Sequence, residues 1–364
     1  MSTHYGKVDF HSHYLSRTYV EYLNKYCDGR PDNYETPEWT EESHLSQMDE
    51  LGIAFSFISL SSPNLTLADC DEEKLLAHQI NTEGAEIAAH HPNRLGLLAT
   101  VPLPNVQDAI AEAQYALDKL GAYGLGLTTN YAGRYLGSPE FDPLMEELDR
   151  RSCLVCVHPT VPQVMPSGVS EALPLPAMEY FFETTRTFVN MVLSNVFVKY
   201  PNIKWVFPHA GAFLSVLNDR FNGFSFPLSI DHPEIMDTDI FRSMRHVYFD
   251  LAGFSTRKLV PALLMDVDVS HLLYGSDAPY TPALACKAMT HMLETMRGVT
   301  ARQSDAIMTG NAIRLVPRLA SVLTAPESPV ELLPRVLWAM REAKEKTRLP
   351  IAAALYRFST ATKK

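Results

Sequence analysis

Short apolar runs recur along this chain, and each is followed by a longer segment in which apolar residues return every three or four positions. The runs predict strands, and their near-continuous apolar character is typical of parallel strands covered on both faces. The longer segments predict amphipathic helices. Strand and then helix, eight times over, predicts an α/β fold, a (β/α)₈ barrel of the TIM type.

The predicted strands cover residues 8–13, 54–60, 95–101, 124–129, 154–158, 205–209, 247–251 and 271–277. The predicted helices cover residues 41–51, 72–90, 106–120, 143–151, 178–200, 214–221, 256–265 and 283–296. An open doubly wound sheet is the alternative, and it too binds ligands at the carboxyl ends of its strands. No Gly-x-Gly-x-x-Gly motif follows the first strand, so dinucleotide binding has little support.

Two long inserts and a tail depart from the strand and helix alternation. Residues 14–40 follow the first strand, and the proline-rich residues 159–177 follow the fifth. Because both inserts come directly after strand ends, we expect them to wall a pocket. Residues 1–324 are expected to form the barrel, and residues 325–364 a C-terminal helical extension, with a helix at 330–341, that serves packing or subunit contact.

Polar residues stand at the ends of four apolar runs, where a barrel has its active-site mouth. The first run ends in His11 and His13, which are two apart on a strand and therefore share one face. The fifth run ends in His158, the sixth in His209 and the eighth in Asp277. Neutral imidazole and carboxylate groups bind zinc and similar cations. We therefore expect a metal centre with proton-transferring groups at this end.

Composition excludes several classes of partner. Of the 364 residues, 46% are hydrophobic, enough for a large core, and 31 basic residues against 42 acidic ones give a net charge of -11. That balance argues against nucleic acid and anionic membrane surfaces as partners. No apolar stretch is long enough to span a bilayer, and no signal peptide is evident. The five scattered cysteines suggest a reducing compartment, so we expect a cytoplasmic protein.

Several motifs resemble those of the amidohydrolase superfamily, over roughly residues 7–320. They are His11-Ser12-His13, His158-Pro159, His209-Ala210-Gly211 and Gly275-Ser276-Asp277. Within the superfamily the chain looks like the branch of aminocarboxymuconate semialdehyde decarboxylase and related aromatic-acid decarboxylases. The stretches at residues 127–131 and 184–187 are most similar to sequences called 6-methylsalicylate decarboxylases.

The resemblance implies roles for the residues at the strand ends. His11, His13, His158 and Asp277 match the positions that hold a divalent metal, usually zinc, with manganese as the second option. His209 matches the catalytic histidine beside the metal. Dinuclear members of the family carry a bridging lysine at the end of the fourth strand, and residues 124–129 contain none. We therefore expect one metal ion per chain, and a homodimer, since dimers are common in the family.

The chain also departs from the family pattern. The glycine run after His209 is reduced, and alanine follows Asp277 where the family usually has tyrosine or phenylalanine. The arginines that bind a dicarboxylate substrate have no clear counterparts, which favours a smaller, monocarboxylic aromatic acid. Four residues stand where a pocket wall is expected and are predicted substrate contacts, with packing within loops as the alternative: Tyr14, Trp39, Asn130 and Phe182.

These features together predict a carboxy-lyase that removes carbon dioxide from a hydroxylated aromatic acid such as 6-methylsalicylate, without oxidation. The metal would hold the carboxylate and its neighbouring hydroxyl. Asp277 would carry the proton to the ring carbon, and His209 would orient Asp277 or act as general base. Three alternatives remain at this stage: a metal-dependent hydrolase of a lactone, ester or amide, a hydratase, and a metal-binding scaffold without catalysis.

Overall fold

The computed structural model of the protein describes residues 6–323, apart from residues 170, 236, 237 and 256. The expected domain boundary at residue 324, the extension 325–364 and its helix 330–341 all lie outside the described residues. Within the described range, no helix combines the length and the apolar character needed to cross a membrane.

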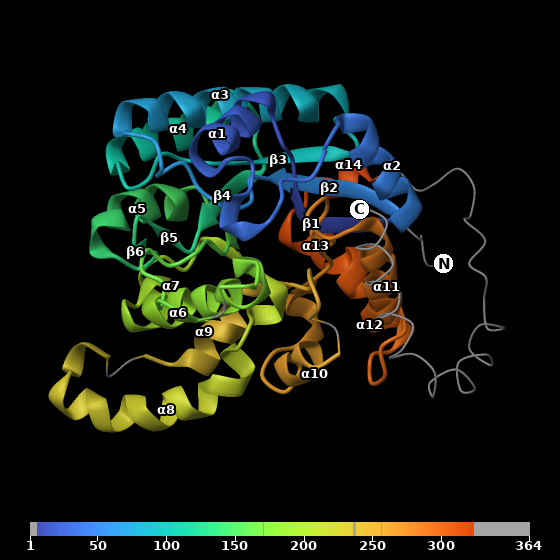
Figure 1. The fold of residues 1–364 in the computed structure, drawn as a ribbon. Coiled ribbons are helices and arrows are strands. Elements are labelled where there is room, and N and C mark those ends of the chain that lie inside the picture. The colour runs from blue at the N-terminus through green and yellow to red at the C-terminus, as the bar shows by residue number, and fades with distance from the viewer. Residues whose placement is uncertain (1–5, 170, 236–237, 256, 324–364) are drawn as a thin grey trace. The chain divides into compact units, whose positions relative to one another are not determined.

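Eight parallel strands form a nearly closed barrel, as the alternation of strands and helices predicts (Figure 1). In hydrogen-bonded order they are β1 (Lys7–His13), β2 (Ile53–Ser59), β3 (Leu95–Ala99), β4 (Gly124–Thr128), β7 (Leu154–His158), β8 (Lys204–Phe207), β9 (Tyr248–Asp250) and β10 (Leu272–Leu273). The last strand returns to the first, because the Phe10 amide donates to the Tyr274 carbonyl at 2.9 Å. This closure excludes the open doubly wound sheet.

The eighth strand is shorter than the predicted range 271–277, since regular pairing ends at Leu273. Beyond it, individual hydrogen bonds hold the chain to β1: the Ser276 amide donates to Asp9 Oδ1 at 3.0 Å, and the Asp277 amide donates to the His11 carbonyl at 2.7 Å. Asp277 has a φ of 62°, a left-handed conformation that a regular strand does not contain. The barrel is therefore closed by an irregular segment that carries a predicted site residue.

Helices alternate with the strands. The α-helices are α1 (Arg17–Cys27), α2 (Glu41–Leu51), α3 (Cys70–His90), α4 (Val106–Asp118), α5 (Asp142–Arg150), α6 (Glu179–Leu193), α7 (Val196–Lys199), α8 (Leu214–Asp231), α9 (Ile240–His246), α10 (Leu259–Leu263), α11 (Ala283–Glu294), α12 (Ala301–Asp305), α13 (Asn311–Leu315) and α14 (Leu319–Val322). Shorter helical turns are η1 (Pro31–Asn33), η2 (Pro139–Phe141), η3 (Leu175–Ala177), η4 (His209–Gly211), η5 (Pro233–Ile235), η6 (Val269–His271) and η7 (Ala306–Gly310). A hairpin of β5 (Asn130–Tyr131) and β6 (Arg134–Tyr135) follows β4.

Local chemistry explains where the predicted helices match and where they do not. Helix α2 begins and ends where the sequence predicts, because Thr40 forms a capping box and Gly52 ends the helix with a φ of 67°. The predicted helix 178–200 is two helices in the structure, separated at Asn195, which has a left-handed φ of 56°. Helix α8 continues ten residues past the predicted end at 221 and accommodates Pro227.

The long insert after β1 contains a helix, α1, that the sequence analysis did not predict. Ser16 caps it by accepting a hydrogen bond from the Tyr19 amide, and Tyr19, Tyr22 and Leu23 are its buried residues. Their spacing of three and four positions is the helical period. The following turn η1 contacts η3 of the second insert, and the Tyr180 hydroxyl of α6 donates to Asp32 Oδ2 at 2.7 Å. The two inserts thus meet near the carboxyl ends of β1 and β7.

A bulge in β1 adjusts the direction of its side chains. Asp9 pairs with Ser56 and Ser12 with Ile58, so three steps along β1 oppose two along β2. Phe10 packs in a buried cluster with Phe57, at 4.6 Å between ring centroids. His11, the next residue, lies with the other histidines instead. Bulges of this kind are common beside active sites, where they re-aim a side chain.

Candidate active site

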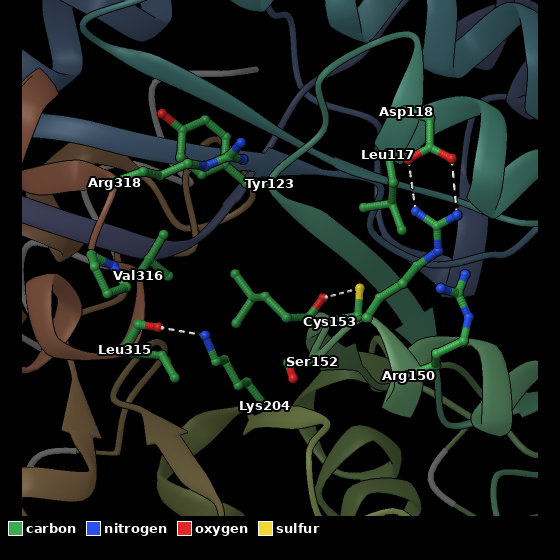
Figure 2. A pocket seen from close by; sticks show the side chains of 13 residues that line it. Leu117, Asp118, Tyr123, Arg150, Ser152, Cys153, Lys204, Leu315, Val316 and Arg318 are labelled. Carbon is green, nitrogen blue, oxygen red and sulfur yellow. Dashed lines mark hydrogen bonds and ion pairs between the residues drawn. The ribbon is translucent and has the colours of Figure 1, made fainter.

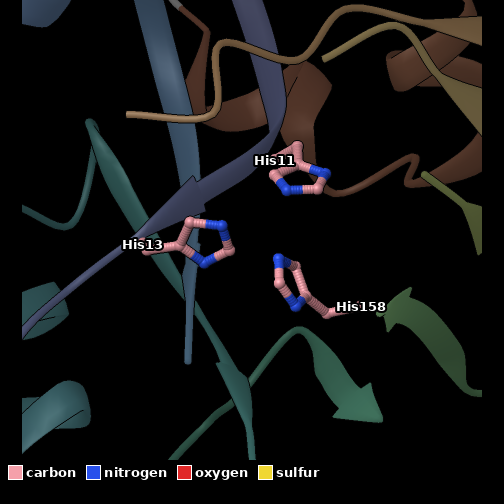
Figure 3. Close-up of side chains that lie close together, drawn as sticks. All are labelled: His11, His13 and His158. Atoms are coloured by element: carbon pink, nitrogen blue, oxygen red, sulfur yellow. The ribbon is translucent and has the colours of Figure 1, made fainter. Parts of the chain in front are cut away.

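Three histidines converge at the carboxyl ends of β1 and β7 (Figure 3). His11, His13 and His158 are buried, and each offers one ring nitrogen, all within 4.8 Å of one another. The ring centroid of His11 lies 5.0 Å from that of His13 and 5.2 Å from that of His158. The pairing of two histidines from the first strand with one from the fifth is the arrangement that the sequence predicts.

The chemistry of these donors fits a bound cation. Nε2 of His11, Nε2 of His13 and Nδ1 of His158 are buried and have no hydrogen-bond partner within the described residues. Burial lowers the pKa of His13 and of His158, so both imidazoles are neutral. Buried polar atoms are nearly always satisfied by a partner, and a divalent metal ion bound by neutral imidazoles satisfies all three together.

Two carboxylates make the same place favourable for positive charge. Asp277 Oδ1 lies 3.6 Å from His11 Nε2 and 3.5 Å from His13 Nε2. Asp250 Oδ2 lies 2.9 Å from His11 Nδ1. Burial alone would lower the pKa of His11, but the negative charge of Asp250 and its hydrogen bond raise it to about 9. The carboxylates that favour a proton here would equally favour a metal cation.

His209 lies beside this cluster on η4, directly after β8. Its ring centroid is 5.0 Å from that of His11, and its Nδ1 has no partner among the described side chains. Burial lowers its pKa to about 4, so the ring is neutral. His209 is not part of the three-histidine group. The structure therefore brings it to the cluster as a separate imidazole, and its catalytic role stays a prediction.

A turn of unusual backbone geometry presents His209. The φ angles of His209, Ala210 and Ala212 are 56°, 53° and 54°, a left-handed region that non-glycine residues rarely occupy. Gly211 has a φ of 73°, and a Cβ added there would lie 2.9 Å from the Phe249 ring. The alanines thus occupy positions that the family's glycine run would occupy more easily. Such strain is typical of sites where a side chain must be held in one place.

Asp250 is a residue of this site that the sequence analysis did not single out. It ends β9, and besides His11 it binds the backbone amides of His209 and Ala252, each at 3.1 Å from Oδ1. Burial would raise its pKa, but the charge of His11, the hydrogen bond to His11, the charge of His209 and the hydrogen bond from the Ala252 amide together hold the pKa below its usual value. The signal was present, because the apolar run Tyr248–Asp250 also ends in an acidic residue. Its hydrogen bonds to His11 of β1 and to the His209 amide after β8 could not be predicted from a single sequence.

Aromatic rings pack against the histidines. The ring centroid of Tyr280 lies 5.5 Å from that of His13, and the ring centroid of Tyr180 lies 5.7 Å from that of His158. Phe181 stacks on His209 at 5.5 Å with an interplanar angle of 16°. The Tyr280 hydroxyl is buried without a partner in the described part of the chain. These three rings were not among the predicted substrate contacts.

The four predicted contacts have other neighbours in the structure. Tyr14 donates to the Ile80 carbonyl at 3.1 Å, and Trp39 donates to His44 Nδ1 at 3.2 Å. Asn130 donates to Glu183 Oε2 at 2.9 Å. Phe182 is 41% exposed and packs against Phe213. Their contact with substrate stays a prediction, whereas the neighbouring Phe181 lies against a site histidine.

A cavity of about 450 Å³ lies at the opposite end of the strands (Figure 2). Its wall includes Tyr123, Cys153 and Lys204, which lie at the start of β4, β7 and β8. Arg151 there pairs with Asp118 at 2.7 Å and with Glu147 at 2.6 Å. Barrel active sites occupy the carboxyl ends of the strands, so this cavity is not the catalytic site.

Known proteins resemble the chain over most of its length. The sequence profile of the amidohydrolase family matches residues 8–318. A decarboxylase of Penicillium terrestre is 32% identical over 86% of this chain and 95% of its own length. The 6-methylsalicylic acid decarboxylase of Penicillium expansum is 30% identical over 87% of this chain and 98% of its own length.

Solved structures agree with the fold. A crystal structure described as amidohydrolase II has a TM-score of 0.81 and 40% identity, and covers 85% of this chain and 99% of its own. A dihydroxybenzoic acid decarboxylase from a Polaromonas species, solved with bound manganese, has a TM-score of 0.75 at 19% identity, covering 86% and 97%. At that identity the likeness shows the fold alone.

Proposed function

The chain belongs to the amidohydrolase family and is a carboxy-lyase within it, and on this premise we propose that it decarboxylates a hydroxylated benzoic acid with the help of one divalent metal ion. One observation carries the proposal. Three buried imidazoles with unsatisfied nitrogens lie at the carboxyl end of the barrel, beside the rings of Tyr180, Phe181 and Tyr280. A cation site lined by aromatic rings suits an aromatic acid, whose carboxylate and ring need those two surroundings.

Four residues would hold the metal: His11, His13, His158 and Asp277. When bound, the cation would supply Lewis acidity and bind the carboxylate and ortho hydroxyl of the substrate. Asp250 orients His11 through its hydrogen bond to Nδ1, which leaves Nε2 available for the cation. No redox step occurs, so the reaction needs no organic cofactor.

Decarboxylation requires a proton at one ring carbon. The bond from that carbon to the carboxylate breaks, its electron pair returns to the ring, and a new carbon–hydrogen bond replaces it. His209 and Asp277 are the groups that we assign to this proton transfer. Asp277 lies against two metal-site histidines, while His209 lies beside His11 on the strained turn. His209 is buried and the Asp277 side chain is 20% exposed, which limits the access of water to the proton.

The substrate with which to begin is 6-methylsalicylate, on which the name of the Penicillium expansum relative is based. Metal-loaded protein should release carbon dioxide and 3-methylphenol from it. The matched control is 2-methylbenzoate, which lacks only the hydroxyl and should react at least about a hundredfold more slowly, because one contact to the metal is lost. Equal turnover of the two acids would reject binding through the hydroxyl. Hydrolysis of lactones, esters or amides with no decarboxylation of any hydroxybenzoate would assign the chain to the hydrolases instead.

Three finer points belong to the same proposal. Zinc is the expected metal because histidine nitrogens and a carboxylate are its usual ligands, and manganese is the second candidate. A homodimer is the expected assembly, and the cytoplasm is the expected compartment. Metal analysis, light scattering and cell fractionation test these points separately from the reaction.

A further inference from the structure

The cavity at the amino ends of the strands combines apolar walls with positive charge (Figure 2). Its volume of about 450 Å³ lies in the range of pockets that bind small organic molecules, roughly 300 to 1,000 Å³. Leu117, Leu154 and Val316 contribute apolar surface, and Asp118 is the one acidic side chain among the lining residues. The basic side chains of the wall are Arg150, Arg151, Lys204 and Arg318. The cavity thus carries an excess of positive charge in a chain whose net charge is -11.

Carboxylates already balance two of these cations. Arg151 donates to both oxygens of Asp118, at 2.7 and 2.9 Å, and its Nε donates to Glu147 at 2.6 Å. Arg150 also donates to both oxygens of Glu147, at 2.8 and 3.0 Å. The charges of the two arginines and the two carboxylates therefore cancel. The excess of positive charge comes from the remaining pair, Lys204 and Arg318.

Lys204 and Arg318 have contacts that supply no full negative charge. The half-buried Lys204 begins β8, and its Nζ donates to the Leu315 carbonyl at 3.3 Å. The guanidinium carbon of Arg318 lies 3.0 Å from the ring centroid of Tyr123. Among the described residues, no carboxylate forms an ion pair with either side chain. Since an ammonium and a guanidinium each carry several donors, both retain donors for an anion.

The same short segment connects these cations to the apolar wall. Leu315, which ends α13, and Arg318, which precedes α14, are separated only by Val316 and Pro317. Leu315 and Val316 are buried, and both line the cavity. An inorganic anion would pair with the cations but leave the apolar wall in contact with water, whereas a neutral apolar ligand would leave the cations unbalanced. A ligand with an anionic head and an apolar body satisfies both parts of the wall.

We propose that this cavity binds a carboxylic acid with a compact apolar body. The carboxylate accepts hydrogen bonds from Lys204 and Arg318, and the body packs against Leu154 and Val316. Hydrogen bonds between charged groups are roughly twice as strong as those between neutral ones, so the carboxylate supplies most of the selectivity. The site is separate from the metal centre, which lies at the other ends of the strands, and the inference does not depend on the proposed reaction.

The test is a calorimetric titration of the full-length, metal-loaded protein with hexanoate, hexanol and inorganic phosphate. Hexanoate should bind at least about tenfold more tightly than hexanol, which lacks the charge, or phosphate, which lacks the apolar body. Lys204→Met and Arg318→Met keep an unbranched apolar side chain without its charge, and each should weaken hexanoate binding about tenfold. Lys258→Met is the matched control, because Lys258 is exposed on the segment between β9 and α10, and it should keep the wild-type affinity.

His158→Ala separates this site from the metal centre, which could also bind a carboxylate. Hexanoate binding that persists in His158→Ala and is weakened by Lys204→Met in that background belongs to the cavity. Loss of all hexanoate binding in His158→Ala would overturn the inference, and so would an affinity that both cation variants leave unchanged. Hexanol or phosphate binding as tightly as hexanoate would also overturn it. If Lys204→Met does not fold, Arg318→Met provides the same comparison, because Arg318 is exposed. Turnover enters none of these measurements, so failure of the proposed decarboxylation leaves the test intact.

Discussion

The two ends of the barrel differ in whether the polar side chains described below have partners. At the amino end, Arg151 pairs with Asp118 and Glu147 at 2.6 to 2.9 Å. At the carboxyl end, buried nitrogens of His11 and His13 have no hydrogen-bond partner within the described chain. A sequence that serves only stability pairs its buried polar groups. Unpaired imidazoles gathered in one place indicate a ligand site at the carboxyl end, although a cavity of about 450 Å³ lies at the other end.

Backbone geometry adds to this contrast. The residues to which we assign the carboxyl-end chemistry include His209 and Asp277, with φ angles of 56° and 62°. The backbone amide of each is held by a residue of another strand: the His209 amide donates to Asp250 Oδ1, and the Asp277 amide donates to the His11 carbonyl. Strain at these positions is thus offset by contacts within the barrel, as is usual at functional sites.

We expect the largest loss of turnover on substitution of His209. This substitution tests whether the carboxyl end of the barrel takes part in catalysis or only binds metal. His209→Asn should keep its metal and lose on the order of 10²-fold or more in turnover, as for a general acid or base. Turnover and bound metal are measured on the same preparation. Loss of metal together with activity would show that His209 is a ligand, and our separation of the two roles would be wrong.

Substitution of Asp250 tests whether this carboxylate positions the metal-binding residue His11. Asp250→Asn keeps a side chain of the same size but weakens the acceptor for His11 Nδ1. The affinity for metal should fall about 10- to 100-fold, as is typical for partners of metal-binding histidines. Competition with a chelator of known affinity measures it. Unchanged affinity with lowered thermal stability would mean that Asp250 serves only to hold β9 against β8.

Glu73 on α3 is a buried polar residue outside the histidine cluster, and its substitution tests whether such an unpaired group only lowers the stability of the fold. Its Oε1 has no partner among the described residues, and burial raises its pKa from 4.5 to about 8. The folded state therefore holds the proton more tightly than the unfolded state, so stability is full below about pH 4.5 and falls as pH rises to about 8. Glu73→Gln removes this loss, and should raise the free energy of unfolding by about 2 kcal/mol at pH 8.5.

Denaturant unfolding of both proteins at pH 4.5 and pH 8.5 measures the difference, which should be near zero at the lower pH. A stabilisation of equal size at both values would show that the charge of Glu73 is not its cause. A loss of turnover in Glu73→Gln would place this carboxylate in the functional part of the molecule after all.

The smallest effect is expected at the amino end. Arg151→Ala should lower the free energy of unfolding by about 1 kcal/mol, less at high salt, because its ion pairs are partly exposed. Turnover should stay within about twofold of the wild type, since surface ion pairs remote from a site rarely affect it. A loss of turnover comparable to that of His209→Asn would break the contrast between the two ends.

Sequence was sufficient for the features that depend on local pattern. The strand Leu154–His158 matches its prediction because a continuous apolar run ends at Pro159, which cannot extend the sheet. The metal-site histidines followed from the same reasoning, since two residues apart on a strand share a face. The alternation of strands and helices therefore predicted the barrel, and the polar residues at the strand ends predicted the cluster of His11, His13 and His158.

Features that depend on contacts between distant segments were not predictable. Asp250 acts on His11, 239 positions away, and no local signal reports that pairing. The ring of Tyr180, at the start of α6, and the ring of Tyr280, after the closing segment, lie against histidines of β7 and β1 that no local pattern connects to them. Helix α1 is the exception, because its buried Tyr19, Tyr22 and Leu23 have helical spacing and could have revealed it.

The most direct test of the central claim is the metal content of the purified protein. Elemental analysis of wild type and His158→Ala, both expressed with added zinc and manganese, compares the carboxyl-end cluster with and without one of its three imidazoles. We predict about one divalent ion per wild-type chain, as three histidines and one carboxylate form one mononuclear site, and almost none in His158→Ala. Two tightly held ions, none, or an unchanged content in the variant would contradict the assignment of this end of the barrel as the metal centre.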